Sequence, residues 1–320
     1  MAVNKQPLVS IVVPARNEEL TIGRCLEAIL ASDYPSHCLQ VIVVDNNSTD
    51  QTAAVAAIYP VQVIQCKQPG VSATRNKGAE HAEGEILGFI DSDCIISQQA
   101  ISTAVTLLQD RRVGACGGTP IAGPESNWIE SAWALKKESA LTTTDILSTA
   151  SFYLNRSVFF DVGCFNYALP AGEDTELSRR IRKKYSLRTH PHLDVIHLGY
   201  PNTFRGFFRR QLWQSSRYLQ SRKYGIDYTL IVTTIYLLSL IAFLTAISFG
   251  LYRASFFPAC IVLGLPPALG LYRIRKSGAR PTVLLFLQSS ILNAVYLTAR
   301  SCGLIVSLGH YLRPTAQARA

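Results

Sequence analysis

The sequence predicts an α/β protein built on a mostly parallel sheet, followed by C-terminal helices that cross a membrane. Short runs rich in Val and Ile alternate with helix-length segments through the first third of the chain. Charge is spread unevenly, because all 22 Asp and Glu lie at or before Asp227 while eight of the 31 Lys and Arg follow it. The last quarter of the chain holds long uncharged stretches, which predict membrane helices rather than a soluble face.

The strand-like runs are short, apolar and bounded by polar or turn residues, and they comprise residues 9–14, 41–44, 61–65 and 86–90. Helical patterns separate them, at residues 18–31, after the capping residues 48–50, and at 72–82. In the first helix we expect Leu20, Ile22 and Leu26 on the buried stripe. This alternation predicts right-handed crossovers and a parallel sheet covered on both faces.

Polar groups follow three of these strands. They are residues 14–18 after the first strand, Asp45 after the second, and residues 91–93 after the fourth. Ligands of such sheets bind at the carboxyl ends of the strands, so we expect these groups to line one crevice.

A diphosphate in this crevice could not be bound by one of the usual glycine-rich loops, because the sequence has neither GxGxxG after its first strand nor GxxxxGK[ST] anywhere. Asp91 and Asp93 offer carboxylate oxygens of the kind that Mg²⁺ or Mn²⁺ prefers. A bound metal would neutralise a diphosphate there. Such DxD pairs also occur by chance on loops. The apolar strand directly before Asp91 and Asp93 favours a metal-binding role for this pair.

Two apolar stretches are long enough to span a bilayer, at about 20 residues for its hydrocarbon core. Residues 229–252 and 254–272 contain 24 and 19 residues without a charge. A third, starting at Pro281, contains Gln288 and Asn293, and either spans or lies along the interface. The alternative, helices buried in a large soluble core, suits shorter runs.

The loop of residues 273–280 carries four positive charges and is expected on the cytoplasmic side, together with residues 1–228. The N-terminus shows no signal-peptide pattern, which agrees with this orientation. We therefore expect an integral protein of a bacterial inner membrane. The eight cysteines show no metal-binding spacing and fit reduced, buried thiols. A nucleic-acid partner is disfavoured, because the excess positive charge lies among apolar runs.

Four motifs, in this order and spacing, resemble the family-2 glycosyltransferases of GT-A fold. They are VSIVVPARNEE from Val9, VVDNNSTD from Val43, GVSATRNKG from Gly70 and FIDSD from Phe89. The resemblance covers roughly the first 230 residues and implies a nucleotide-diphosphate-sugar donor, with a UDP-sugar expected. It implies that the nucleotide is bound by Pro14, Ala15, Arg16, Glu18, Asp45, Arg75, Asp91 and Ser92. Asn46 stands where the family has a second carboxylate.

The resemblance also implies a catalytic base. Glu173 and Asp174 open a helix, where acidic residues suit the helix dipole in any protein. In the family, an acidic pair at this point supplies the base, so Asp174 would accept the proton of the acceptor hydroxyl, with Glu173 supporting it. His197 ends a strand-like run and is either a structural histidine or, beside Asp91 and Asp93, a third metal ligand.

Basic and aromatic residues alternate over residues 203–223, as in a helix lying on anionic headgroups. A single-stranded nucleic-acid groove uses similar residues, but the adjoining span argues against it. Within this segment, Gln214, Arg217 and Tyr218 resemble the QxxRW motif of membrane-bound polysaccharide synthases, with tyrosine for tryptophan. The resemblance implies that they lie near the acceptor and the diphosphate. Trp128 and Trp133 are expected to pack in a core.

These observations predict a cytoplasmic GT-A domain over residues 1–200, an interfacial helix over 201–228, a transmembrane region over 229–312 and a tail over 313–320. The expected transmembrane helices are residues 229–252, 254–272 and 281–308. The expected reaction is inverting, metal-assisted transfer of a sugar to a lipid or lipid-linked glycan. Two alternatives stay open: a processive polysaccharide synthase and a catalytically silent membrane scaffold that binds nucleotide sugars.

Overall fold

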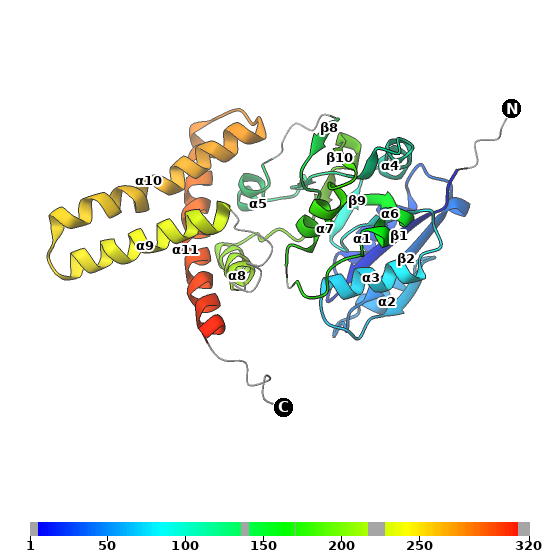
Figure 1. The fold of residues 1–320 in the computed structure, drawn as a ribbon, viewed down its shortest axis with the longest axis horizontal. Coiled ribbons are helices and arrows are strands. Elements are labelled where there is room, and N and C mark those ends of the chain that lie inside the picture. Colours follow the sequence, from blue (N-terminus) through cyan, green and yellow to red (C-terminus); the bar gives the residue numbers. More distant parts are fainter. Residues whose placement is uncertain (1–5, 136–140, 170, 217–227, 313–320) are drawn as a thin grey trace. The chain divides into compact units, whose positions relative to one another are not determined.

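The computed structural model describes residues 6–135, 141–169, 171–216 and 228–312. The chain divides into two compact units, each made of two segments. The first unit comprises residues 1–123 and 138–199, and the second comprises residues 124–137 and 200–320. Figure 1 gives the elements of both along the chain.

The first unit is built on an eight-stranded sheet in the order β3-β2-β1-β4-β9-β6-β10-β8. Its strands are β1 (Val9–Ala15), β2 (Leu39–Asp45), β3 (Gln62–Gln65), β4 (Ile86–Phe89), β6 (Val113–Gly117), β8 (Thr142–Thr144), β9 (Phe152–Asn155) and β10 (Ser186–Thr189). The pairs β3-β2, β2-β1, β1-β4 and β6-β10 are parallel. Strand β9 runs antiparallel to both its neighbours, and β8 is antiparallel to β10. The predicted fold class, a mostly parallel α/β sheet, is confirmed.

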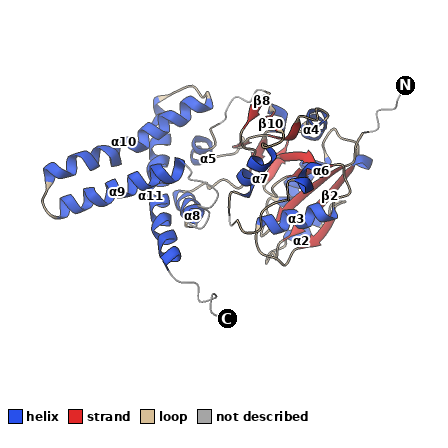
Figure 2. Ribbon diagram, in the orientation of Figure 1, coloured by secondary structure: helices blue, strands red, loops and turns tan. Residues whose placement is uncertain are grey.

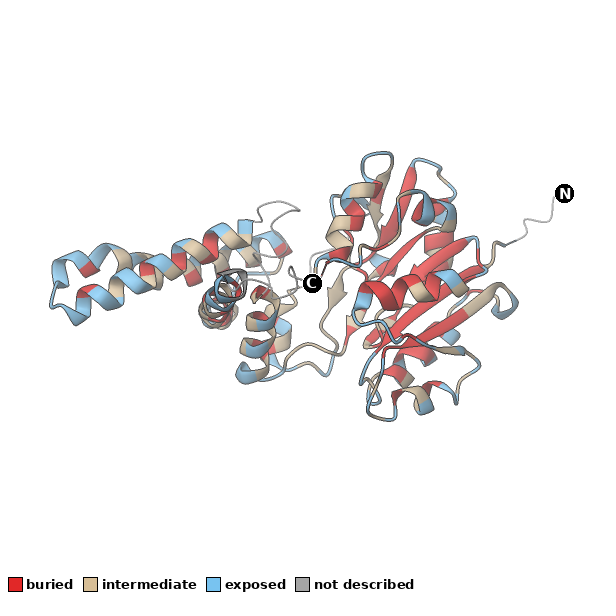
Figure 3. Ribbon diagram, turned by 60° about the horizontal axis from the view of Figure 1, so that its bottom comes forward, coloured by how far each residue is buried: buried red, intermediate tan, exposed pale blue. Residues whose placement is uncertain are grey.

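Helices cover the two faces of this sheet (Figure 2). They are α1 (Ile22–Leu30), α2 (Thr52–Ala56), α3 (Val71–His81), α4 (Ala100–Leu108), α6 (Arg156–Asp161) and α7 (Glu173–Ile181), with short 3₁₀ turns η1 (Ser36–Cys38) and η2 (Pro191–Leu193). Alternate residues of each strand enter opposite cores, because a strand's side chains alternate between faces. Ile11 packs with α1 and α4, whereas its neighbour Val12 packs with α3, α6 and α7. The inner strands β1, β2, β4, β6 and β9 are accordingly buried along most of their length, whereas the edge strands β3 and β8 are not (Figure 3).

A second, small sheet joins three short strands in the order β5-β11-β7. They are β5 (Cys94–Ile96), β7 (Pro120–Ile121) and β11 (Val195–His197). Strand β11 runs antiparallel to β5, with His197 opposite Cys94. The backbone N–H of Leu198 donates to the carbonyl of Asp93 at 2.7 Å. This sheet therefore brings a histidine from late in the unit beside the residues that follow β4.

One expectation for the core is wrong. Helix α1 begins at Ile22 rather than at residue 18, and Leu20 lies in the preceding turn with 88% of its surface exposed. The turn instead closes through the carbonyl of Glu18, which accepts the N–H groups of Thr21 and Ile22. Ile22 and Leu26 are fully buried, as predicted.

The second unit is helical. It contains α5 (Trp128–Trp133), α8 (Phe204–Ser215), α9 (Tyr228–Ser248), α10 (Tyr252–Ser277) and α11 (Val283–Leu312). Among the described residues, three helices are long and apolar enough to cross a membrane, at Tyr228–Ser248, Tyr252–Ser277 and Val283–Gly309. Helices α9 and α10 form a hairpin whose surface is largely exposed (Figure 3). Of the predicted interfacial helix, α8 is described, whereas Arg217 and Tyr218 lie outside the described residues.

Helix α11 crosses the α9–α10 hairpin at a steep angle instead of lying parallel to it (Figure 1). Leu297, in the middle of α11, is buried among Val232 and Tyr236 from the first half of α9 and Leu269 from the last third of α10. Further along, Gly303 meets α8 so closely that a Cβ there would lie 2.6 Å from the Leu212 carbonyl oxygen. The middle of α11 thus packs on one end of the hairpin.

Trp133 and its neighbours form a small core in this unit, as expected, whereas Trp128, which was also expected in a core, has 37% of its surface exposed. Ile129 and Ala132 of α5 are buried with Phe207 of α8 and Leu292 of α11, and Trp133 packs against them. Asn127 begins α5 with a capping box, in which its side chain accepts from the backbone and the Glu130 carboxylate accepts from the Asn127 N–H. The short helix is therefore held both by its cap and by apolar contacts.

Candidate active site

Hydrogen bonds join the loops that follow β1 and β2 at the carboxyl edge of the sheet. The backbone N–H of Asn17 donates to Ser48 Oγ at 3.0 Å, and the Asn17 side chain accepts from the Thr49 N–H at 2.8 Å. The N–H of Glu18 donates to Thr52 Oγ1 at 2.7 Å. Asn17 holds a left-handed φ of 58°, a conformation that asparagine tolerates better than most residues. These bonds fix the position of the loop that contains the predicted donor-binding residues.

The predicted nucleotide contacts of the first two strands lie at this edge. Pro14 and Ala15 end β1, with Ala15 directly opposite Asp45 at the end of β2. Asp45 is 3% exposed, and one of its carboxylate oxygens accepts from the N–H of Ser48 at 3.3 Å. Arg16 is exposed beyond the strand. Burial raises the pKa of Glu18, and the nearby negative charge of Asp93 adds to this rise.

Asn46, the residue that departs from the family motif, has a structural role. Its side-chain amide donates to the carbonyls of Cys66 and Gln68, both at 2.7 Å, and the residue is 5% exposed. A carboxylate cannot donate, and in this place its charge would face two carbonyl oxygens. The amide therefore joins the end of β2 to the segment after β3.

The DxD segment forms a tight turn between β4 and β5. The N–H of Cys94 donates to the carbonyl of Asp91 at 3.0 Å, and Ser92 is 5% exposed. The turn sends its two aspartates to different partners. Asp91 accepts from Arg75, whereas Asp93 lies against His197.

Arg75, on α3, joins two of the predicted motifs. Its Nη2 donates to Asp91 Oδ1 at 2.6 Å and its Nη1 donates to Glu173 Oε1 at 2.7 Å. Arg75 is 3% exposed, and its guanidinium also lies over the Phe165 ring, 5.5 Å from the centroid. Its pKa is raised, because the charges of Asp91 and Glu173 outweigh the burial that would lower it. Arg75 was expected to contact the nucleotide, and in this structure it binds two carboxylates.

Asp174 occupies the first turn of α7, next to Glu173. Burial raises the pKa of Asp174 to about 6, and the negative charge of Glu173 adds to the rise. The backbone N–H of Thr175 donates to Asp174 Oδ1 at 2.6 Å and, with the positive charge of Arg75, opposes the rise. Such a carboxyl group exchanges its proton near neutral pH, as a general base must.

Asp93, Cys94 and His197 form a cluster whose potential ligand atoms all lie within 4.8 Å of one another. His197 Nε2 is 3.5 Å from Asp93 Oδ2. Burial and the charge of Asp93 raise the pKa of the Cys94 thiol well above its ordinary value, so the thiol keeps its proton. The carboxylate and the imidazole are the harder ligands of the cluster, whereas a thiol is a soft ligand. This donor pair suits Mn²⁺ or a similar divalent metal.

Gly199 leaves room for this cluster. A Cβ at this position would lie 2.0 Å from Asp93 Oδ2, so any other residue would displace the carboxylate. The sequence interpretation assigned no role to Gly199 or Cys94. The position of Cys94 directly after the DxD pair could have indicated that it lies at the site. No sequence feature indicates that Gly199 lies against Asp93.

The predicted acceptor-side residue Gln214 lies in the second unit. Its side-chain oxygen accepts from Arg300 Nη2 of α11 at 2.6 Å, and the Gln211 side-chain oxygen accepts from Arg300 Nε at 3.0 Å. Gln214 is thus bound to a helix that follows it by more than sixty residues. Neither the motif resemblance nor helix periodicity indicated this contact.

The sheet, the edge loops and the acidic residues at their ends define a domain that binds a ligand at the carboxyl edge of an α/β sheet. Residues 10–168 match the sequence model of "Glycosyl transferase family 2". These residues form a family-2 glycosyltransferase domain, and their sheet has a GT-A-like fold.

The sequence is similar to those of several glycosyltransferases. The glycosyltransferase AglE of Haloferax volcanii is 30% identical over 185 residues, which cover 54% of this chain and 61% of AglE. The beta-monoglucosyldiacylglycerol synthase of Synechocystis is 30% identical over 117 residues, which cover 34% of this chain and 24% of that protein. In both cases the chain spans less than two thirds of its relative's length.

Solved structures share the fold. The mannosyltransferase PcManGT of Pyrobaculum calidifontis, in complex with GDP-Man and Mn²⁺, superposes with a TM-score of 0.58 at 19% identity. The superposition covers 95% of this chain and 88% of PcManGT. At this level of identity the likeness concerns the fold.

Proposed function

We propose that the chain is an inverting glycosyltransferase of a bacterial inner membrane, with residues 1–200 on the cytoplasmic side. It transfers a sugar from a nucleotide-diphosphate sugar, with a UDP-sugar as the first candidate, to a lipid or lipid-linked glycan. Asp174 acts as the general base, and Asp91, Asp93 and His197 serve a divalent metal. Pro14, Ala15, Arg16, Glu18, Asp45 and Ser92 hold the nucleotide.

One observation carries this proposal: Arg75 binds Asp91 on one side and Glu173, the neighbour of Asp174, on the other. The buried guanidinium holds the DxD turn and the start of α7 at a fixed separation. In a displacement at an anomeric carbon, the leaving group and the attacking hydroxyl lie on opposite sides of that carbon. A rigid link between the donor side and the base side therefore suits this reaction.

Asp93 and His197 would hold the metal, with Asp91 as a further oxygen ligand. When bound, the metal would neutralise the charge of the leaving diphosphate. Asp91 already shares one oxygen with Arg75, so its other oxygen remains for that role. The presence of Mn²⁺ in the PcManGT complex supports the choice of a divalent metal.

Asp174 would accept the proton of the acceptor hydroxyl as the new bond forms. Its pKa of about 6 keeps most of the group deprotonated at neutral pH while leaving it basic enough to take a proton. Glu173 adds to that basicity through its charge, and Arg75 limits the effect. We assign Glu173 to positioning, because its carboxylate is bound by Arg75.

A lipid-derived acceptor is supported by the three apolar helices and by the basic, aromatic α8 that precedes them. The names of relatives fit this assignment, since the Synechocystis protein is named a synthase of a glucosylated diacylglycerol. The cluster Arg273, Arg275, Lys276 and Arg280 at the end of α10 supports a cytoplasmic position for that end. Gln214, Arg217 and Tyr218 are assigned to the acceptor side.

The test is nucleotide release by the full chain in lipid nanodiscs, with Mn²⁺ or Mg²⁺, a panel of UDP- and GDP-sugars, and a lipid extract as the acceptor. We expect one donor to be used, and Asp174→Asn and Asp91→Ala to lose at least a hundredfold in rate. Asp161→Asn, on the exposed end of α6, is the matched control and should keep full activity.

Three results would contradict parts of the proposal. Turnover by Asp174→Asn at the wild-type rate would remove the base assignment. Donor binding without release or transfer would favour a silent scaffold. A ladder of products, instead of a single added sugar, would favour a processive synthase over single transfer.

A further inference from the structure

Helix α11 packs across the base of the α9–α10 hairpin, which is the end formed by Tyr228 and Ser277 (Figure 1). Leu297 of α11 is buried there with Val232 of α9, and Leu269 of α10 packs against them. The rise from Val232 to the turn before α10 corresponds to about 29 Å of helix. The hydrocarbon core of a bilayer is about 30 Å thick. The part of the hairpin beyond the crossing is therefore long enough to span it.

Helix α8 follows α11 along its middle. Phe207 of α8 is buried together with Leu292 of α11. Two turns further along both helices, a Cβ on Gly303 would lie 2.0 Å from the Ser215 side-chain oxygen. Helices α5 and α8 lie on one side of α11, and the hairpin extends away from the other side (Figure 1). The orientation of α11 relative to the bilayer therefore also decides where α8 lies.

The charges of these two helices disfavour a spanning α11. Arg300 would lie about 6 Å from the bilayer centre if Val283–Gly309 crossed it, because it is four residues past the middle of that segment. Its guanidinium donates to Gln211 and Gln214 of α8, so α8 would enter the hydrocarbon beside it. Helix α8 exposes Arg205 and Arg209. Charged side chains at that depth are costly, whereas at the membrane surface they are favourable.

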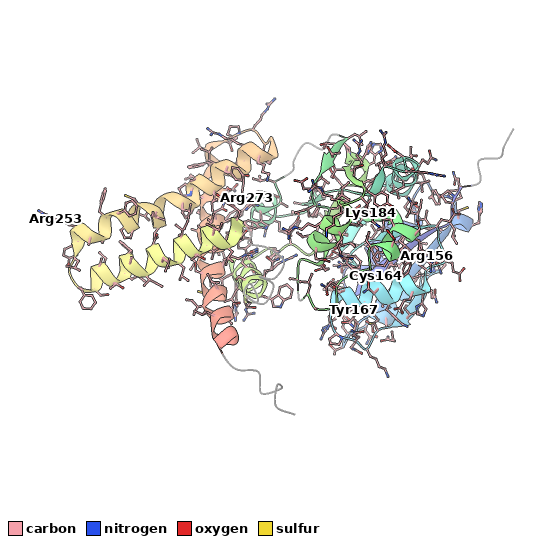
Figure 4. The ribbon with its side chains drawn as sticks, in the orientation of Figure 1. Arg156, Cys164, Tyr167, Lys184, Arg253 and Arg273 are labelled. Atoms are coloured by element: carbon pink, nitrogen blue, oxygen red, sulfur yellow. The ribbon has the colours of Figure 1, made fainter. Side chains whose placement is uncertain are left out.

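The side chains around the crossing are of the kinds that collect at a membrane surface. The guanidinium of Arg273 lies 3.7 Å from the centroid of the Trp133 ring, and Trp133 packs on Tyr296 of α11 with ring centroids 5.3 Å apart. Tryptophan and tyrosine are enriched at the headgroup level. Arg253 lies at the other end of α10, at the far tip of the hairpin (Figure 4). The uncharged residues 254–272 thus separate two levels marked by arginine.

The exposed apolar side chains are distributed differently on α9 and α11. On α9 those between residues 231 and 247 cover about 240° of the helix circumference, at 100° per residue. A helix that is apolar nearly all round suits a membrane span. On α11 those between residues 283 and 308 fall within about 160°. They include Leu284, Leu287, Ile291, Ile305 and Leu308. One apolar face, with α5 and α8 packed elsewhere, is typical of a helix at the membrane surface.

We propose that α11 lies along the membrane surface at the base of the hairpin, and that α9 and α10 alone cross the bilayer. The apolar face of α11 contacts the boundary between headgroups and acyl chains, on the side toward which the hairpin extends. The surface is that of the leaflet next to Arg275, Lys276 and Arg280, which the charge pattern assigns to the cytoplasm. This arrangement does not depend on sugar transfer.

The experiment is electron paramagnetic resonance of the spin-labelled full chain in lipid bilayers, where collisions with oxygen and with a water-soluble nickel complex report the depth of each label. Leu287 and Ile305 are 52% and 54% exposed. They face the same direction about 27 Å apart along α11, because five whole turns separate them. We expect labels at Leu287→Cys and Ile305→Cys to differ in depth by less than about 5 Å.

Ile231→Cys and Ile247→Cys are the matched control, since both residues are exposed and lie about 24 Å apart along α9. Their labels should differ in depth by about 20 Å. The exposed and half-buried thiols Cys38, Cys164, Cys260 and Cys302 are replaced by alanine in every variant. A depth difference on α11 as large as that on α9 would show that α11 spans. Equal depths for the two α9 labels would show that the hairpin does not span, and would also overturn the proposal.

The side of the membrane that α11 reaches gives a second measurement, which needs no label on the helix itself. A membrane-impermeant maleimide is applied to inverted and right-side-out vesicles carrying Arg253→Cys, Arg280→Cys or Arg313→Cys, which lie at the hairpin tip, before α11 and after it. We expect Arg280→Cys and Arg313→Cys to react from one side and Arg253→Cys from the other. Reaction of Arg313→Cys from the same side as Arg253→Cys would overturn the proposal. Sugar transfer is not measured, so failure here would leave the proposed reaction untouched.

Discussion

Replacement of Arg75 by glutamine should destabilise the first unit strongly, because it leaves two carboxylates without their shared cation. Arg75 is 3% exposed, and the side chains of Glu173 and Asp91 are 11% and 30% exposed. Removal of one partner from a buried ion pair costs about 3–5 kcal/mol, and the partial exposure of Asp91 favours the lower figure, about 3 kcal/mol. For a unit of this size, that corresponds to a fall in Tm of roughly 6–12 °C.

The unfolding of this unit can be followed through its own thiols. Cys25, Cys66, Cys94 and Cys116 are buried in the first unit, so a thiol-reactive dye labels them only as it opens. Cys38 and Cys164 of the same unit are only half-buried, so their labelling before heating sets the baseline, whereas Cys260 lies in a helix expected in the membrane. Tryptophan fluorescence would report the wrong unit, because all three tryptophans lie in the second.

Arg112→Gln is the control for this measurement. It removes an arginine that also pairs with an aspartate, Asp110, but whose side chain is 86% exposed, so its Tm should stay close to that of wild type. Arg75→Lys should fall between the two, since one ammonium cannot bind both carboxylates in the paired geometry of a guanidinium. If Arg75→Gln unfolded within about 1 °C of Arg112→Gln, the bridge would not stabilise the unit and the reasoning would be refuted.

The rate of sugar transfer should fall as pH drops below about 6, because Asp174 must be deprotonated to act as a base and its pKa is raised to about 6. Arg75→Gln should move the midpoint upward, since the charge of Arg75 lowers this pKa; a flat kcat profile between pH 5 and 8 would contradict the assignment. Gly199→Ala should weaken Mn²⁺ binding at least tenfold by displacing the Asp93 carboxylate, whereas Gly264→Ala, which meets no atom within 4 Å, should not. Electron paramagnetic resonance of free Mn²⁺ measures both, and equal affinities would show that Asp93 tolerates the added methyl group.

The fold of the first unit was largely predictable, because its strands carry the strongest local signal. The buried β-branched runs of β1, β2 and β4 predicted their positions and the carboxyl edge at which Asp45 and Asp91 lie. The insertion of β9 between β4 and β6 could not be predicted, since strand order depends on pairing between distant segments. Leu20 shows the limit of periodicity, because it continues the apolar stripe but lies in a turn that other residues fix.

The site was predictable as a set of motifs but not as a set of contacts. The sequence separates Arg75 from Glu173 by 98 positions, and only the folded sheet, to which both helices belong, brings the two side chains within hydrogen-bond distance. The sequence shows only that Asn46 replaces a carboxylate of the family motif. Its structural role follows from the two backbone carbonyls to which its side chain donates. The position of Gly199 against Asp93 depends on the pairing of β11 with β5. Local patterns thus indicated which residue types matter, while long-range pairing decides their partners.

The division of the chain has a practical consequence for obtaining a soluble catalytic fragment. The polypeptide passes between the two units three times, after residues 123, 137 and 199. Cutting after Gly199 would therefore leave residues 124–137 on the fragment while removing Phe207 and Leu292, against which Ile129 packs. The apolar side chains of α5 would then be exposed to solvent and would promote aggregation. A well-behaved fragment would need a polar linker in place of that helix.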